Sequence, residues 1–98
     1  MAEEQYDTYY DELQNYLKSP DEDRENITAL LKRAHAWVQG RCGEFDLDHV
    51  RGRDLVFNRV RFDYNGYSEH FESSFMSELS SLSFELWEPE GDTDAEET

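Results

Sequence analysis

Apolar residues recur at intervals of three and four along this chain, and this spacing limits the fold to packed helices. The clearest stripe lies on one face of a helix and consists of Ile27, Leu30, Leu31, Ala34, Trp37 and Val38. Ser19-Pro20-Asp21-Glu22 precedes the stripe and matches a capping box with proline at the first helical position. Gly40 and Gly43 follow the stripe and predict the end of this helix.

Three further helices are predicted from the same spacing, at about residues 7–18, 53–64 and 68–81. Asp7 or Thr8 can cap the first of them. The connector before the third helix holds Phe45, Leu47 and Val50, which we expect to fold back onto the helices because they are apolar. The sequence therefore predicts an all-α fold, a small bundle of about four helices.

A different period follows the last predicted helix. Leu82, Phe84 and Leu86 alternate with Ser83 and Glu85, and a repeat of two residues is typical of a strand. A single strand in a helical chain has no internal partner for its backbone groups, so another chain could supply that partner. The alternative is an extended segment that lies on its own bundle. We expect a strand-like C-terminal segment in either case.

The end of the chain has the composition of a disordered segment. Residues 88–98 contain six acids, Pro89 and Gly91, with Ala95 as their only apolar residue. We therefore predict one helical domain over residues 1–87 and a disordered acidic tail over residues 88–98.

The net charge of −15 is unevenly distributed. Residues 1–23 have a net charge of −7, residues 24–61 of +3 and residues 62–98 of −11. One interpretation is an acidic surface adapted to high salt, because only two of the nine basic residues are lysines. The other interpretation is a protomer whose basic middle meets the acidic part of a neighbour, through an inter-subunit basic patch of Arg51, Arg53, Arg59 and Arg61.

The expected core is thin, because hydrophobic residues make up only 37% of the chain. Small domains with thin cores usually depend on a disulfide, a metal or a partner. The single Cys42 cannot form an internal disulfide, and His35, His49 and His70 are too scattered for a zinc site. We therefore expect no metal and no cofactor, and a homo-oligomer instead.

The usual catalytic patterns fail on this sequence, so we expect a protein that is not an enzyme. The five glycines are too dispersed for a phosphate-binding loop. Cys42 would need a neighbouring base, which His35 or His49 could supply only if the fold happened to bring one of them close. Asp46-Leu47-Asp48 lacks the rest of a calcium loop. Direct DNA binding by the arginines is disfavoured because the net charge of −15 would repel DNA.

Two features of the sequence bear on its location. The first residues, MAEEQYDTYY, lack the basic start and the apolar run of a signal peptide. No apolar stretch approaches the roughly 20 residues that a membrane span requires. With one free cysteine, these features favour an intracellular protein with no membrane partner.

The order of these features resembles the small head–tail connector (adaptor, or head-completion) proteins of long-tailed phages. The resemblance covers about residues 8–86 and includes a tyrosine-rich first helix, an acid-capped second helix and a characteristic late segment. Matching positions in the late segment are Val60, Arg61, Phe62, Tyr64, Asn65, Phe71, Phe75, Ser77, Glu78, Leu79, Ser80 and Leu82. Phe62, Gly66 and the acidic tail depart from the family pattern.

The resemblance implies a virion protein at the head–tail interface, assembled in the host cytoplasm. Such a protein forms a dodecameric ring below the portal protein, extends the DNA channel without binding DNA specifically, and offers a face to the next connector or tail protein. The strand-like pattern and the resemblance together predict a portal-docking segment made of Leu82, Phe84, Leu86 and Trp87.

A second hypothesis is an acidic DNA mimic that inhibits a host nucleic-acid-binding protein. The net charge of −15 motivates this hypothesis. The eight basic residues within residues 24–61 argue against it, because a mimic gains nothing from concentrating them.

Overall fold

The structure of the protein, a computed structural model, describes residues 2–18 and 23–87. All regular secondary structure in these residues is helical, which confirms the predicted all-α class. The elements in chain order are α1 (Ala2–Leu17), α2 (Arg24–Cys42), α3 (Val50–Tyr64), the 3-10 helix η2 (Ser68–His70), α4 (Phe71–Ser74) and α5 (Met76–Leu86).

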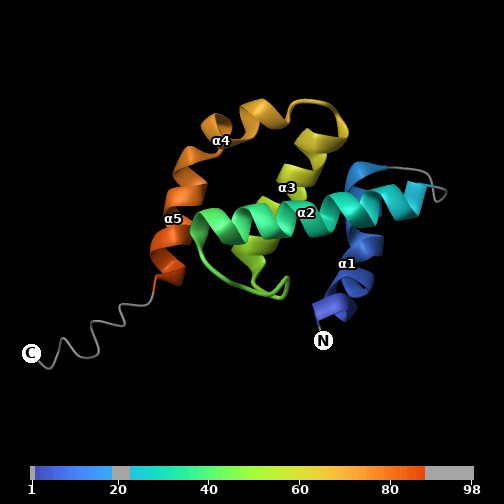
Figure 1. Ribbon diagram of the computed structural model, residues 1–98, viewed down its shortest axis with the longest axis horizontal. Helices are drawn as coiled ribbons and strands as arrows, with labels where there is room; N and C mark the ends of the chain where they lie inside the picture. The colour runs from blue at the N-terminus through green and yellow to red at the C-terminus, as the bar shows by residue number, and fades with distance from the viewer. Residues whose placement is uncertain (1, 19–22, 88–98) are drawn as a thin grey trace, which may run out of the picture.

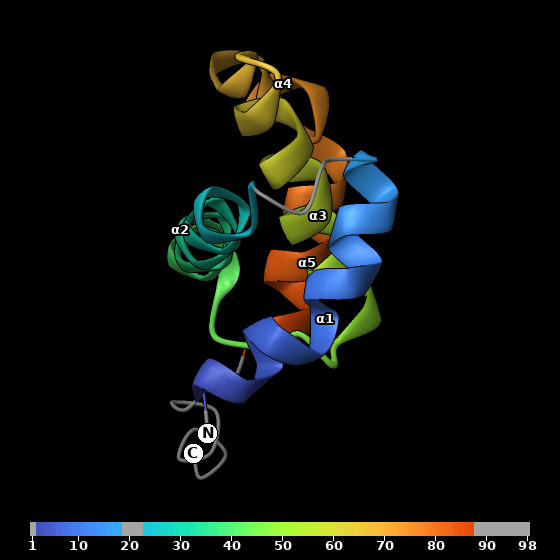
Figure 2. The same ribbon diagram turned by 90° about the vertical axis from the view of Figure 1, so that its right-hand side faces the viewer.

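Helix α2 is the central element of the fold and packs on α1, α3 and α5. It crosses the molecule in front of α3, with α1 near its N-terminal end and α5 near its C-terminal end (Figure 1). Figure 2 looks along α2 and shows α1, α3 and α5 on the same side of it. The helices therefore form two layers, with α2 as one layer and α1, α3 and α5 as the other.

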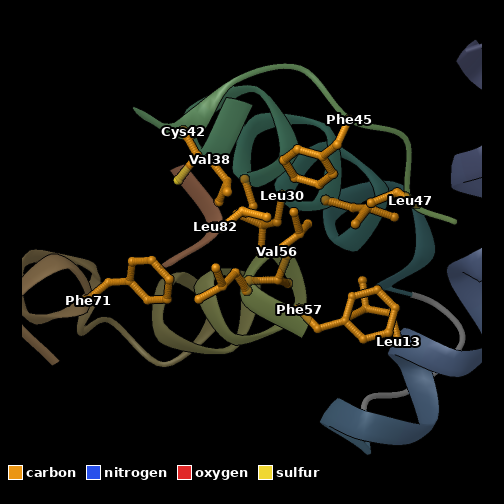
Figure 3. Packing of buried hydrophobic residues seen from close by; sticks show 14 of the residues in the cluster. Leu13, Leu30, Val38, Cys42, Phe45, Leu47, Val56, Phe57, Phe71 and Leu82 are labelled. Carbon is orange, nitrogen blue, oxygen red and sulfur yellow. The ribbon is translucent and has the colours of Figure 1, made fainter. Parts of the chain in front are cut away.

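The core lies between these two layers. The α2 stripe is buried as predicted, except that Trp37 is only partly buried. Leu13 of α1 lies beside Phe57 of α3 at one end of the core, and Phe71 lies at the other end (Figure 3). The side chains that the other elements bury here are Tyr10, Leu13, Leu55, Val56, Phe57, Val60, Phe71, Leu79 and Leu82.

The connector between α2 and α3 folds back onto the core, as predicted for two of its three apolar residues. Phe45 and Leu47 are buried. The Leu47 backbone is also satisfied, because its N–H donates to Gln5 Oε1 at 2.7 Å and its carbonyl accepts from Arg53 Nη1 at 2.9 Å. The prediction for Val50 is wrong: this residue begins α3 on its outward side and is 64% exposed.

Two predicted helix boundaries also need correction. Helix α1 begins at Ala2, so Asp7 and Thr8 lie within it and do not cap its start. Helix α2 continues through Gly40 and ends at Cys42, and Gly43 follows with a positive φ of 128° that suits glycine. The predicted capping box at residues 19–22 lies outside the described residues.

The predicted strand-like segment is wrong, because Leu82, Phe84 and Leu86 belong to helix α5. Leu79, Leu82 and Leu86 are spaced three and four residues apart, so they share one helical face that turns toward the core. Phe84 then lies on the opposite side and is exposed. The alternation arose because one outward aromatic residue lies between two inward leucines.

The predicted fourth helix is present but interrupted. A turn of 3-10 helix and the short α4 precede α5, and the backbone leaves the helical conformation at Phe75 (φ −115°, ψ 23°). The rings of Phe71 and Phe75 stack with centroids 4.8 Å apart at this bend, which holds α4 against α3 through Phe62. The predicted acidic tail, residues 88–98, lies outside the described residues.

Candidate assembly surface

One strip of the outward side of α5 is exposed and uncharged, and it lies beside the exposed acids Glu78 and Glu85. We define the α5 face as Met76, Ser77, Ser80, Ser81, Phe84 and Trp87, all of which are exposed. Phe84 is 79% exposed, Trp87 is 66% exposed and Met76 is 47% exposed. Three large apolar side chains thus lie in water, two on α5 and one on the residue that directly follows it, next to small hydroxyl groups.

The absence of charge on this face is unusual for this protein, in which 34% of the residues are charged. Protein–protein interfaces lose charged residues at their centres and are enriched in aromatic residues and methionine. Single exposed apolar residues need no explanation, whereas several on one face indicate a contact surface. The α5 face therefore has the composition of an assembly contact.

An open depression of about 320 Å³ lies beside the α5 face, lined by Arg41, Ser80, Ser83, Phe84 and Trp87. Arg41 comes from the last turn of α2, where its charge is favoured by the helix dipole. Its Nε donates to Glu72 Oε2 at 3.0 Å, and its Nη2 donates to Met76 Sδ at 3.7 Å. This side chain links α2, α4 and α5 and fixes one edge of the depression.

The structure separates the four residues of the predicted docking segment. Phe84 and Trp87 are on the surface, whereas Leu82 is fully buried and Leu86 packs against the core. Met76 and the serines fall in the predicted fourth helix, at about residues 68–81, but the strand period assigned from Leu82 onward separated them from Phe84 and Trp87. The helical spacing from Met76 to Ser80 to Phe84 was the signal that could have found them.

A network of side chains holds α5 against the start of α3. His49 caps α3, since its Nδ1 accepts from the Gly52 N–H at 3.0 Å. The proton of the neutral ring is therefore on Nε2, which donates to Glu85 Oε2 at 3.0 Å. Arg51 Nε lies 3.3 Å from Glu85 Oε1. The orientation of α5 is thus tied to α3 through one carboxylate.

The four arginines of the predicted basic patch point in different directions around α3, because successive residues turn by about 100°. Arg51 reaches α5, as above. Arg53 lies over the Tyr9 ring of α1, 4.6 Å from its centroid, and near Glu12. These two arginines therefore connect α3 to its neighbours within the protomer.

The other two arginines also have partners inside the protomer. The Arg59 guanidinium lies 4.3 Å from the Trp37 ring centroid, with its Nε 3.6 Å from Asp63 Oδ1. Arg61 donates to Asn58 Oδ1 at 3.0 Å. The structure thus places the four arginines apart, and their role between subunits stays a prediction.

His35 and Cys42 are residue types found in catalytic sites, but here both form hydrogen bonds that stabilise the fold. His35 is buried, with Nδ1 accepting from the Tyr6 hydroxyl at 2.9 Å and Nε2 donating to the Phe45 carbonyl at 2.8 Å. Cys42 Sγ donates to the Leu79 carbonyl at 3.3 Å. Burial raises the pKa of the Cys42 thiol, which lowers its reactive thiolate fraction, although Arg41 opposes this effect.

The described residues contain neither a metal-binding cluster nor a membrane-spanning helix. In the part of the chain that the structure describes, no three His, Cys, Asp or Glu side chains are grouped so that they could hold a metal ion. No helix among the described residues is long and apolar enough to cross a membrane.

No family model matches the sequence, and no curated protein and no solved structure matches it. The function is therefore inferred from the α5 face, the charge distribution and the resemblance described above.

Proposed function

We propose that this protein is a structural subunit of a head–tail connector ring in a tailed virus. The observation that carries the proposal is the uncharged α5 face, where Phe84 and Trp87 are largely exposed in a chain of net charge −15. Burying these two rings against a partner would remove apolar surface from water, which favours association. The resemblance to small connector proteins supplies the identity of the assembly.

In this role the chain is one protomer of a homo-oligomeric ring, dodecameric by the resemblance, that docks below the portal protein. A closed ring needs two different and complementary surfaces on each protomer. The ring extends the DNA channel and offers a face to the next connector or tail protein. Acidic side chains along the channel would repel DNA within about 8–10 Å at moderate salt, so DNA passes without specific binding.

The structure reduces the predicted docking segment to two of its four residues. Leu82 and Leu86 stabilise the protomer, so only Phe84 and Trp87 of the four predicted residues are available to a partner. The partner binds the side of a helix rather than pairing with a strand edge. In the virion this surface would lie at the head–tail interface, after assembly in the host cytoplasm.

The test is to locate the protein on particles of the virus that encodes it. We expect antibody against the full chain, carrying gold, to label one vertex of each particle, at the head–tail junction. Proteomic analysis of purified particles provides the matched control, with the portal protein as a marker. Absence of the chain from purified particles, or label confined to another site, would contradict the proposal.

A second candidate function, the acidic DNA mimic, is favoured by one observation. Arg51, Arg53 and Arg59 lie near Glu85, Glu12 and Asp63 of the same chain. These three of the eight basic residues in 24–61 have acids of the same chain beside them, so they count less against a mimic. Salt-sensitive binding to a nuclease or restriction factor, without self-assembly, would favour the mimic over the ring.

A further inference from the structure

The outward side of α2 is poor in acidic residues, whereas the rest of the protein surface is acidic. Residues 26–43 contain no acid and three basic residues, although the chain has 24 acids in total. Ala29, Arg33, Ala36 and Gly40 are exposed on the side of α2 that faces away from the core, and we call them the α2 face. A Cβ placed on Gly40 would meet no atom within 4 Å, so this face is open.

Arg33 differs from the other arginines in the contacts of its side chain. Several arginines lie over aromatic rings, at 4.1 Å for Arg24 and Tyr10, 4.6 Å for Arg53 and Tyr9, and 4.3 Å for Arg59 and Trp37. Arg33 is exposed and has neither a ring nor an ion pair among the described residues. Phe84 and Trp87 likewise make no ring contact within the described part of the chain.

We propose that the α5 face of one protomer packs on the α2 face of the next protomer, with Phe84 and Trp87 against Arg33. This inference rests on the proposed ring function and names the contact that builds the ring. Arginine over an aromatic ring is favourable, and most so when the pair is removed from water. The two faces belong to different helices, and in a head-to-tail arrangement each protomer therefore engages two neighbours.

Charge is the reason that the occupant of the α5 face is a second copy of this chain. Two protomers of net charge −15 repel each other unless their contact keeps acids apart. The α5 face carries no charge, although Arg41 lines the depression beside it, and the α2 face carries the cation of Arg33, with Glu25 one turn before Ala29 as the nearest acid on α2. Large side chains would also meet small ones in this contact, because exposed aromatic rings face alanine and glycine. Contact between them brings no acid of one face against an acid of the other.

Sedimentation of the full chain over a range of concentrations tests the contact. We expect self-association, with a dissociation constant raised about tenfold or more by Phe84→Ser or Trp87→Ser. Tyr67→Ser is the matched control, since Tyr67 is 59% exposed but lies outside the α5 face, and it should have no effect. Arg33→Glu should weaken association more than Lys18→Glu, which changes the net charge equally away from the α2 face.

Cross-linking between copies tests the geometry directly. Ala36→Cys and Ser80→Cys are prepared separately, mixed and oxidised mildly, while the native Cys42 stays buried in both. We expect a disulfide-linked dimer that contains one copy of each variant. Asn15→Cys mixed with Ala36→Cys is the control, because exposed Asn15 lies on α1, and this mixture should give no specific dimer.

The possible failures can be told apart. Association that is insensitive to Phe84, Trp87 and Arg33, with no cross-link, overturns this contact but leaves gold label at the head–tail vertex as support for the ring. A chain that stays monomeric at every concentration also overturns the contact. If Phe84→Ser self-associates normally but no longer labels the vertex, the α5 face binds the portal instead.

Discussion

The ring of Phe45 occupies the space that a side chain at Gly52 would need. A Cβ on Gly52 would lie 2.5 Å from Phe45 Cδ2, closer than such atoms approach in proteins. Phe45 is buried over this position and also donates its backbone N–H to Gln39 Oε1 at 3.2 Å. The absence of a side chain at Gly52 therefore allows the connector to close over the start of α3.

Replacing this glycine should destabilise the protein, whereas replacing another helical glycine should not. We expect Gly52→Ala to lower the free energy of unfolding by about 1–3 kcal/mol, because the Phe45 ring must move. Gly40→Ala is the matched control and should raise it by about 0.5–1 kcal/mol, since Gly40 is exposed within α2. Urea unfolding followed by circular dichroism measures both values. Equal effects of the two substitutions would contradict this packing.

The cap at the start of α3 gives a second prediction. His49→Ala removes the acceptor for the Gly52 N–H, so we expect a loss of about 1 kcal/mol in the free energy of unfolding. His49→Asn keeps a capping acceptor and loses only the half-exposed bond to Glu85, which contributes little. The asparagine variant should therefore be nearly as stable as the wild type. Similar losses in both variants would show that Glu85, not the cap, is the main partner.

The central helix could be predicted from the sequence because its stripe is long and regular. Five of its six predicted core residues are buried, and Trp37 is partly so. The start of α1 could not be placed, since Asp7 and Thr8 are good caps wherever a helix begins but are also tolerated within one. Local chemistry indicated that these helices exist, whereas their ends depend on tertiary contacts.

The C-terminal segment shows why short patterns mislead. Leu82, Phe84 and Leu86 fit a strand period, but Leu82 and Leu86 also fit a helix once Leu79 is included. Phe84 and Trp87 belong to the docking segment predicted with Leu82 and Leu86, and the structure exposes these two, with Phe84 on a helical face rather than at a strand edge. The basic patch was harder to predict, because residues close in sequence point in different directions on a helix.

Cys42 provides a prediction about pH. Burial raises the pKa of its thiol above its ordinary value, so the folded state binds the proton more tightly than the unfolded state. Its contribution to stability is therefore complete below the unfolded pKa and is lost as pH rises through the folded pKa. We expect the free energy of unfolding to fall above about pH 9, and to fall less in Cys42→Ala.

The same thiol should react slowly with a disulfide reagent at about pH 8, because little thiolate forms while it is buried. Unfolding in urea should restore the normal rate. Tyr64 has a raised pKa as well, through burial and its hydrogen bond to Asp23, so it adds to the alkaline loss of stability. The Tyr64→Phe variant removes the contribution of Tyr64, so comparison with Cys42→Ala separates the effects of the two residues on stability at alkaline pH. Rapid reaction of the folded thiol would contradict the buried position of Cys42.

The acidic surface predicts how stability depends on salt. The exposed ion pairs of Arg24 with Asp7 and Arg41 with Glu72 contribute at most about 1 kcal/mol each, and salt weakens them. Repulsion within a chain of net charge −15 acts over the whole surface, and the Debye length falls from about 10 Å at 0.1 M to about 3 Å at 1 M salt. The stability gained when salt screens this repulsion should therefore exceed the stability lost from the weakened ion pairs.

We expect the thermal midpoint to rise by several degrees between low and molar sodium chloride. The combined variant Asp11→Asn and Glu44→Gln tests the cause, because both acids are exposed and neither has a hydrogen bond or ion pair within the described residues. It should be more stable than the wild type at low salt and should gain less from added salt. Glu85→Gln is the matched control, since it removes the same type of charge together with its bonds to His49 and Arg51 and should lower stability. A midpoint that stays constant or falls as salt is added would show that the ion pairs outweigh the repulsion.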